Sequence, residues 1–527
     1  MGKYLLKRIL FSIVSLLIVI MTVMLLVFSL INRNVIFQTD DRWNKTSGND
    51  QKVYEYNQFQ KYQYLTYTNY TNFVKSKYSE KYGEDNFTTP EYSADLKAIK
   101  NAKTYRDNPT VKEFIEKYES EGYEIVYLPQ QAQKNGTIKK GYSAYLLAVK
   151  ENNVFLRLWL YIKGLFTVET TSDVTDPALT EEMRGIKFIN DPYGWWAITG
   201  SGTTHKYLLY FDGRFPFIHQ NWIHLHLGIS YTQYRNQEIF DVITAPNGSI
   251  ITSMQQFPNM IGTDEYEETA IDFHTLTYNA EPTVDDLKNY PDNYTSSSMH
   301  RAGLSRLEIS FVMGIISTII AYLLGLPIGI LMARKKDKLA DKIGNLYIIF
   351  IMAVPSLAYI FMFAAFGTKV FNLPYNFATA EVQILGYILP IISLSLPSVG
   401  SLMKWMRRYM IDQMNSDYVK FARAEGLSER EIYRTHISRN ALIYIVHGIP
   451  GSILGSLTGA IITERVYNVP GVGNLLTRAI NGHDNGVIIA STVFYTTITI
   501  ISIILGDILL AKYDPRISLS SERGGGR

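Results

Sequence analysis

The chain has 527 residues, of which 47% are hydrophobic and only 19% are charged, so it is too long for one ordinary domain and richer in apolar residues than its charge would suit. Residues 1–32 and 301–527 together carry a formal charge of +11, whereas residues 33–300 carry −8, so the net charge of +3 is a cancellation. The lack of cysteine excludes disulfides and thiolate sites, and the charge distribution does not indicate binding of nucleic acid.

Residues 1–32 are predicted to form an uncleaved membrane helix. An apolar run from Leu10 to Ile31 follows Lys3, Lys7 and Arg8, and it is long enough to cross a bilayer. A secretory signal peptide begins in the same way, but its apolar region has only about 7 to 15 residues and ends at a small-residue cleavage site. The run in this chain is longer and is not followed by such a site.

Residues 33–300 form the acidic part of the chain and are expected to fold as an α+β domain. They are numerous enough to bury a core without disulfides, and they contain 25 of the 38 tyrosines. Because tyrosine covers apolar surface while its hydroxyl stays hydrated, this enrichment fits either a solvated fold or a surface that contacts peptides. The solvated fold is the simpler interpretation.

Local signals in the acidic part predict a helix and two strands. Thr110 followed by Glu113 indicates a capped helix that runs to about Glu121. The segments Tyr123–Leu128 and Tyr142–Val149 have the composition of strands.

Two aromatic segments of the acidic part, Phe155–Phe166 and Phe215–Gly228, are amphipathic but too polar to span a membrane. We expect them to lie along the outer membrane surface or against the helix bundle. His219, His224 and His226 lie close together in sequence, but without a nearby carboxylate pattern they predict no metal site.

Five further apolar runs of membrane-spanning length follow residue 300. They are Ser310–Met332, Ile343–Phe366, Val382–Met403, Ile443–Val466 and Val487–Ala511. Basic residues collect after the first of these runs and between Lys404 and Arg439, a segment with eight of them. Because basic loops stay on the cytoplasmic side, both termini are expected inside and residues 33–300 outside.

The predicted fold is therefore mainly α, a six-helix polytopic membrane bundle with an α+β extracellular domain between helices 1 and 2. The expected divisions are residues 1–32 for the first transmembrane helix, 33–300 for the extracellular domain, 301–520 for a five-helix core with a cytoplasmic loop at 404–442, and 521–527 for a disordered tail.

The long basic loop predicts a short helix, a sharp turn and a second helix. Ser416 can cap a helix that runs through Glu425, and Gly426 can adopt the left-handed conformation that ends it. Ser428 and Glu431 have the spacing of a capping box for the helix that follows. A rigid, protruding segment of this kind transmits force well.

Small and charged residues in the same loop predict a contact with another protein. Ala422 and Ala424 would let a second surface approach closely, while Arg423 and Glu425 could set its register by charge.

The predicted spans contain glycines and prolines at positions that should affect helix packing and bending. Gly451, Gly455 and Gly459 recur every four residues, a spacing that lets membrane helices pack closely. Kinks are expected at Pro327, Pro355 and Pro450. His447 is the ionisable residue well inside span five, where it could line a pathway or pack through a hydrogen bond.

These segments resemble the permease subunits of ABC importers for dipeptides and oligopeptides, in particular the first permease subunit of the oligopeptide systems. The resemblance is carried in the loop by Tyr418, Ala422, Ala424, Gly426, Leu427 and Ser428, and then by Arg439 to Leu442. After span five it is carried by Glu464, Val466, Pro470, Gly471, Val472, Gly473, Leu475 and Leu476. Residues 325–329, 506–507 and 513–516 and the segment Asn221–Ile243 also match.

This chain departs from the family pattern in two places. Lys420 and Phe421 stand where the broader importer consensus has Glu and Ala. The connection between spans one and two, residues 33–300, is much longer than in the usual family member.

The resemblance implies a type I importer in the plasma membrane, in which this chain is a non-catalytic subunit. The implied partners are a second homologous permease, two cytoplasmic ATPase subunits, an extracellular substrate-binding lipoprotein and a peptide substrate. No cofactor is expected in this chain, because ATP and Mg would be bound by the ATPase subunits. The implied ATPase-coupling residues are Tyr418, Val419, Ala422, Arg423, Ala424, Glu425, Gly426 and Leu427, and the packing residues are Gly451, Gly455, Gly459, Pro470, Gly471 and Gly473.

Two other classes of function stay open from the residues alone. A secondary transporter or channel would need charged groups inside the membrane, and a membrane-anchored sensor would bind peptide with its outer domain. The sequence has no Gly-x4-Gly-Lys-Ser/Thr phosphate loop, so the chain itself is not expected to bind ATP. The cysteine-free exterior favours a Gram-positive cell.

Overall fold

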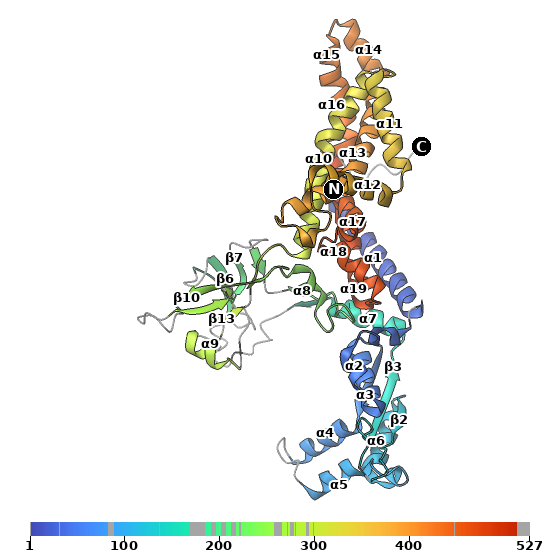
Figure 1. The fold of residues 1–527 in the computed structure, drawn as a ribbon, viewed down its shortest axis with the longest axis vertical. Coiled ribbons are helices and arrows are strands. Elements are labelled where there is room, and N and C mark those ends of the chain that lie inside the picture. The colour runs from blue at the N-terminus through green and yellow to red at the C-terminus, as the bar shows by residue number, and fades with distance from the viewer. Residues whose placement is uncertain are drawn as a thin grey trace.

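The computed structural model is elongated, with long helices in one half and two lobes of helices and strands in the other (Figure 1). It describes residues 2–30, 32–82, 89–135, 137–168, 176, 185–190, 196–201, 207–211, 218–220, 223–257, 266–270, 272–274, 279, 281–290, 293, 295–298, 300–446 and 448–513. The short helices α14 (Asp417–Ala424) and α15 (Glu429–Glu431) lie at one tip of the molecule. Helices α4 (Tyr70–Tyr82) and α5 (Pro90–Ala98) lie at the opposite end.

The apolar runs of the sequence form the long helices. These are α1 (Gly2–Leu30), α10 (Arg306–Arg334), α11 (Leu339–Ala353), α12 (Ser356–Phe371), α13 (Leu385–Met414), α16 (Ser438–Val446), α17 (Ile449–Val466), α18 (Val472–Asn481) and α19 (Asn485–Tyr513). In the described part of the chain, four helices are long and apolar enough to cross a membrane, and two bent pairs bring the number to six if each pair is one span. Four predicted spans correspond to the single helices α1, α10, α13 and α19, and the other two overlap the bent pairs α11 with α12 and α16 with α17.

Two of the three expected kinks coincide with breaks between helices. Helices α11 and α12 meet at 113°, because Pro355 lacks an amide hydrogen and Val354 before it is extended. Helices α16 and α17 meet at 47° near Pro450, and His447 lies outside the described residues. Helix α10 continues through Pro327 without a break.

The first and last long helices pack side by side. Their shared apolar cluster includes Ile20 and Met24 of α1 and Ile489, Ala490 and Val493 of α19. Near the other end of the pair, Arg8 lies 3.3 Å from Asp507. The bundle is therefore closed by helices from opposite ends of the chain.

Glycines of α10 allow its close packing against α13. A Cβ built on Gly325 would lie 2.8 Å from Cβ of Leu402, and one built on Gly329 would lie 2.8 Å from Cβ of Met406. Real Cβ atoms do not approach so closely, so only glycine fits at both positions. This is the small-residue packing that membrane helices use where no hydrophobic force draws them together.

Gly451 and Gly455 of α17 do not make the close packing expected from their spacing with the described residues. A Cβ on Gly455 would meet no described heavy atom within 4 Å, and one on Gly451 would meet Ser502 Oγ at 3.7 Å. Gly459 lies in the same helix. The spacing of these glycines determines the helix face on which they lie, but it does not determine whether another helix of this chain covers that face. Close packing against a second subunit stays a prediction.

A buried ion pair joins α11 to α13 on the side of α14. Arg407 donates to both carboxylate oxygens of Asp341, at 2.6 and 2.8 Å, and Asp341 is almost fully buried. The Asp337 N–H adds a further hydrogen bond at 2.9 Å. A bidentate pair fixes both distance and orientation, so it holds the beginning of α11 against α13.

Residues 32–153 form the first lobe, an α+β unit as the sequence predicts. Its elements are α2 (Asp41–Lys45), α3 (Gly48–Lys61), β1 (Leu65–Asn69), α4, α5, α6 (Pro109–Ser120), β2 (Glu124–Leu128) and β3 (Tyr145–Glu151). The strands form an antiparallel sheet in the order β1-β3-β2. The two predicted strands are thus present.

The predicted cap of helix α6 is wrong by two residues. Asn108, not Thr110, occupies the N-cap, where its Oδ1 accepts the N–H groups of Thr110 and Val111 at 2.8 and 3.1 Å. The Thr110 hydroxyl instead donates to Asp95. Pro109 stands at the first helical position, which proline favours because its missing N–H has no partner there, and this signal places the start.

The abundant tyrosines of the first lobe build its core. Its two apolar clusters contain the buried side chains of Tyr54, Tyr62, Tyr64, Tyr70, Tyr78, Tyr92 and Tyr105. Tyr105 stacks on Tyr127 with ring centroids 4.1 Å apart. In the first lobe these tyrosines therefore serve core packing, which is consistent with the solvated fold given above as the simpler interpretation.

The second lobe lies beside the first (Figure 1) and consists mainly of antiparallel strands. Its elements are β5 (Gly185–Asn190), β6 (Trp196–Ser201), β7 (Tyr207–Phe211), β8 (Ile218–Gln220), β10 (Ile250–Gln255), β11 (Glu267–Ala270), β12 (Asp272–His274), α9 (Val284–Asn289), β13 (Thr295–Ser298) and β14 (His300–Arg301). Between the lobes and the bundle lie α7 (Val154–Gly164), β4 (Phe166–Val168), β9 (Ile223–Leu225) and α8 (Ile239–Thr244).

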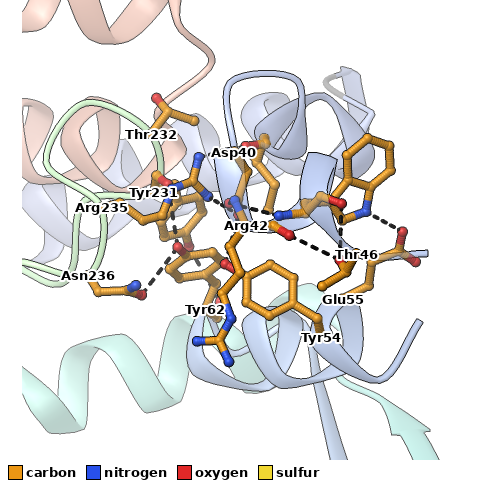
Figure 2. A network of polar contacts seen from close by, with 12 residues as sticks. Asp40, Arg42, Thr46, Tyr54, Glu55, Tyr62, Tyr231, Thr232, Arg235 and Asn236 are labelled. Carbon is orange, nitrogen blue, oxygen red and sulfur yellow. Dashed lines mark hydrogen bonds and ion pairs between the residues drawn. The ribbon is translucent and has the colours of Figure 1, made fainter. Parts of the chain in front are cut away.

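A buried polar network ties the first lobe to the loop before α8 (Figure 2). Asp40 accepts hydrogen bonds from Arg235 Nη1 and from the Tyr54 hydroxyl, both at 2.8 Å. Its other oxygen caps α2 through the Arg42 N–H at 2.9 Å. Burial, followed by the hydrogen bond to Asp40, raises the pKa of Tyr54 to about 12, so the phenol stays neutral and donates.

Replacing Asp40 should open this junction. The change Asp40→Asn leaves the Arg235 cation without its counter-charge, and breaking a buried pair costs about 3 kcal/mol. The control Arg42→Gln removes an exposed cation that only overlies the Tyr54 ring at 5.2 Å, which is worth less than about 1 kcal/mol. Hydrogen-exchange mass spectrometry of peptides from α2 and residues 230–236 checks both variants. Equal exchange in the two would contradict this role of Asp40.

Candidate functional site

The helices and turn predicted in the basic loop form a knob at the tip of the molecule, which we define as α14, the turn at Gly426 and α15 (Figure 1). Gly426 has φ +82, so the expected left-handed turn is present. Ser428 Oγ accepts the Glu431 N–H at 3.3 Å, which is one half of the expected capping box. Ser416 stands at the N-cap of α14, but its side chain accepts no capping hydrogen bond from the described residues.

One face of α14 is buried against the bundle. Val419 and Ala422 are enclosed, and the half-buried Tyr418 and Leu427 pack beside them. Their partners come from α10, α13, the π-helical turn before α16, and α16 itself: Ala333, Met406, Met410, Ile432, Ile437, Ala441 and Ile445. The Tyr418 hydroxyl also donates to Gln413 Oε1 at 2.6 Å. These residues attach the knob to the bundle, so Ala422 does not offer the contact surface expected of it.

The opposite face of α14 is free of the bundle. Phe421 is 70% exposed, and Lys420, Arg423, Ala424 and Glu425 are also exposed. Sequence reasoning treated Phe421 only as a departure from a consensus, although the helical period places it opposite Val419. A large exposed aromatic side chain between charged neighbours is typical of a protein contact.

Charges within the knob are partly engaged with each other. Arg423 Nε lies 2.7 Å from Glu429 Oε1 across the Gly426 turn, and this hydrogen bond raises the pKa of Arg423. Lys420 Nζ lies 2.8 Å from Asp417, and that contact lowers the pKa of Asp417. Arg423 thus braces the turn as well as facing solvent.

A cavity with a volume of about 550 Å³ lies between the helices of the bundle. Its walls come from α10, α12, α13, α16 and α17, with lining residues that include Thr318, Tyr322, Ser356, Tyr359, Ser398, Ser401, Trp405, Tyr409, Tyr444, Ser452, Gly455, Ser456 and Thr463. None of the described lining residues is ionisable as an acid, a lysine, an arginine or a histidine. Hydroxyls and aromatic rings can contact a polar chain without selecting one charge.

The apolar cluster beneath the knob shares side chains with the cavity wall. Leu402, Tyr409 and Ile445 line the cavity and also belong to the cluster that buries Val419 and Ala422. Continuous packing therefore connects α14 to the cavity wall.

The turn after α17 is held by a buried carboxylate. Glu464 accepts the Ser310 hydroxyl at 2.6 Å and the Asn474 N–H at 2.9 Å, so it caps α18 and contacts α10. A Cβ on Gly473 would lie 2.5 Å from Cα of Ile461, and one on Gly471 would collide with the Glu464 carboxylate. The motif glycines, with Pro470 before them, therefore let this turn fold onto α17.

Asp484 is a joint that the sequence interpretation missed. Its carboxylate accepts the Ser230 hydroxyl at 2.6 Å and the N–H groups of Tyr231, Thr232 and Gln233 at 2.8 to 2.9 Å. It also accepts the Val487 N–H at 3.2 Å as the cap of α19. An Asp directly before an apolar helix predicts the cap. Its second role depends on a loop about 250 residues away in sequence.

The structure does not assemble a metal site from the described residues, where no group of three or more His, Cys, Asp and Glu is suitably placed. His224 and His226 have ring centroids 6.5 Å apart, and His226 Nε2 lies 2.8 Å from Thr167 Oγ1. The side chain of His219 lies outside the described residues.

The chain matches known proteins over its whole length. A family model described as "Binding-protein-dependent transport system inner membrane component" matches residues 325–519. The oligopeptide transport system permease protein AmiC of Streptococcus pneumoniae is 32% identical over 538 residues, which cover 100% of both chains. The dipeptide transport system permease protein DppB of Lactococcus lactis is 32% identical over 229 residues, covering 43% of this chain and 74% of its own. A solved chain of the MetNI methionine ABC transporter aligns with 40% of this chain and 94% of its own, at 13% identity and a TM-score of 0.33.

The full-length match includes residues 33–300, so the long insertion is shared with the streptococcal relative. Permeases of this kind are non-catalytic, multi-pass membrane subunits of transporter complexes that also contain ATPase and substrate-binding partners. The chain belongs to the oligopeptide and dipeptide branch of the inner-membrane permeases of binding-protein-dependent ABC transport systems.

Proposed function

We propose that this chain is one of the two membrane-spanning subunits of an ATP-driven importer of oligopeptides. One observation carries the proposal: the same apolar cluster buries one face of α14 and reaches the wall of the cavity. The other face of α14, with Phe421 outermost, remains available to a partner. This arrangement suits a subunit that receives force at the knob and changes the shape of a pathway.

The peptide substrate is supported by the cavity and by the relatives. AmiC is named an oligopeptide permease and DppB a dipeptide permease. Peptides share a backbone but differ in side-chain charge, so a pathway that accepts many of them benefits from neutral walls. The described lining of hydroxyl and aromatic groups meets that requirement.

The complete transporter would contain a second homologous permease, two ATPase subunits and an extracellular substrate-binding lipoprotein. The second permease would cover the exposed glycine face of α17 around Gly451 and Gly455 and complete the pathway. ATP and Mg would be held by the ATPase subunits. When these subunits close on ATP, they would displace the knob that is bound to them. A ligand shifts such an equilibrium only by its differential affinity for the two states, so tight attachment of the knob is essential.

The proposed orientation places both termini and the knob in the cytoplasm of a Gram-positive cell and residues 33–300 outside. The basic segment from Lys404 to Arg439 includes the knob, and basic loops stay in the cytoplasm. The first and second lobes lie at the other end of the long helices (Figure 1). There they could receive the lipoprotein that delivers the peptide.

The change Phe421→Ser should weaken attachment of the ATPase subunits. Loss of one buried Phe side chain, worth about 1.5 to 3 kcal/mol, corresponds to roughly 10-fold to 100-fold weaker binding. The matched control is Phe155→Ser, because Phe155 is 67% exposed but lies on α7 at the insertion end of the bundle. Affinity purification from native membranes measures the ATPase retained with each variant. Complexes that lack ATPase subunits even with the wild-type chain would overturn the proposed function and favour a secondary transporter or a sensor.

The change Gly426→Val should uncouple ATP hydrolysis from transport. Gly426 has φ +82, where a β-branched residue is strained, whereas an added Cβ would meet no described atom within 4 Å, so any effect comes from the backbone. Gly426→Asn is the control, because Asn tolerates the left-handed region. Reconstituted complexes with Val should hydrolyse ATP but lose most peptide uptake, while those with Asn should keep it. Normal uptake with Val would refute the role of this turn.

A further inference from the structure

Helix α7 lies across the insertion ends of α1 and α19 and has two different faces (Figure 1). One face packs on the bundle cluster through Leu158 and Tyr161. The other presents Phe155, Leu156 and Trp159 to the surroundings, and none of these three is less than 41% exposed. Tryptophan with apolar neighbours on an amphipathic helix is typical of the membrane interface.

Arg157 lies on the inner side of α7 and is only 4% exposed. Its guanidinium carbon lies 3.3 Å from the ring centroid of Phe28 and 3.8 Å from that of Tyr64, so the cation is placed between two aromatic rings. Aromatic faces attract a cation, but they do not neutralise its charge. The Nε atom has no hydrogen-bond partner among the described residues.

Among the described residues, the pocket beside Arg157 supplies no counter-ion for it. This pocket has a volume of about 110 Å³, and no carboxylate occurs among the described residues that line it. Burial raises the pKa of Tyr62, Tyr64 and Tyr231, so these phenols are neutral and supply no negative charge. A buried cation whose neighbours are all neutral costs several kcal/mol of stability, on the order of the penalty for one desolvated ion.

The residues that line this pocket place it at the ends of α1 and α19 nearest the insertion. Met24 and Phe28 come from the end of α1, and Ile489 comes from the beginning of α19. Lys61, which is exposed at the end of α3, stands at its rim with a second positive charge. The pocket therefore has an apolar wall formed by two spans and two basic groups on the side of the lobes.

We propose that the pocket between α1, α7 and the loop at residues 227–231 binds the phosphate group of an outer-leaflet phospholipid, with Arg157 as its principal ligand and Lys61 as a second. A guanidinium binds phosphate oxygens through two parallel hydrogen bonds, which would satisfy the unpartnered Nε. The apolar wall would lie along the acyl chains, continuous with the exposed apolar face of α7.

The bound lipid would join the insertion to the membrane. Arg157 contacts Tyr64 of the first lobe and Phe28 of α1, so a lipid held by Arg157 would link both segments to the bilayer. This inference requires only the membrane location and the orientation proposed above. It is independent of which substrate the transporter carries.

Lipid retention by the intact purified complex tests the proposal. Native mass spectrometry, after reconstitution with phosphatidylglycerol and extraction into detergent, should detect one tightly held lipid per copy of this chain. Arg157→Gln should weaken retention by about tenfold or more, because a hydrogen-bonded charged contact is lost. Lys61→Gln should weaken it about fivefold, since one Lys near a lipid surface contributes this much.

The controls separate a specific site from general attraction and from loss of folding. Lys163→Gln removes an exposed positive charge from the same helix and should leave retention unchanged. If Arg157→Gln gives no intact complex, lipid retention by the Lys61→Gln variant, which changes an exposed residue, tests the proposal instead. Retention equal to wild type in Lys61→Gln, or in an intact Arg157→Gln complex, overturns the proposal. Inorganic phosphate that competes with the lipid at equal concentration would assign the site to a free anion and overturn the lipid assignment.

Discussion

Burial of Val419 and Ala422 against α10, α13 and α16 is the packing on which the rest of the structure depends. A short helix of eight residues has little stability of its own, so the knob keeps its shape because one face is enclosed. The Asp341 to Arg407 pair fixes α11 against α13 near the same end. The knob, the cluster and the cavity wall are in continuous contact, as the proposed transmission of force from the knob requires.

The insertion end is organised by polar contacts instead. Asp484 collects donors from the loop at residues 230–233, and Asp40 collects Arg235 and Tyr54 from two elements of the insertion. Buried carboxylates with several donors define one arrangement, because each donor left unpaired would cost free energy. The two ends of the molecule are therefore held by different interactions. Apolar packing attaches the knob to the bundle, and carboxylates that accept several hydrogen bonds fix the position of the lobes.

Local features were predictable from the sequence, and contacts between distant segments were not. The length of the apolar runs predicted the membrane-spanning segments. A glycine between two helix-capping signals predicted the turn at Gly426. The helical period also places Ala422 on the same face as the buried Val419. We nevertheless expected Ala422 to contact a partner, because small residues in this loop suggested a contact surface. Glycines at the same spacing on α10 and α17 differ in packing only because α13 covers one set. The roles of Asp484 and Arg157 depend on partners far away in the chain.

The contact between α1 and α19 also affects how the protein is made. The first helix is synthesised at the start, yet its packing partners Ile489, Ala490 and Val493 emerge from the ribosome near the end. In the proposed orientation residues 33–300 cross the bilayer during that time, and the first lobe folds outside before the other helices of the bundle are inserted. In that orientation α1 is the described helix that holds the nascent chain in the lipid during the interval, a role that suits its apolar run from Leu10 to Leu30.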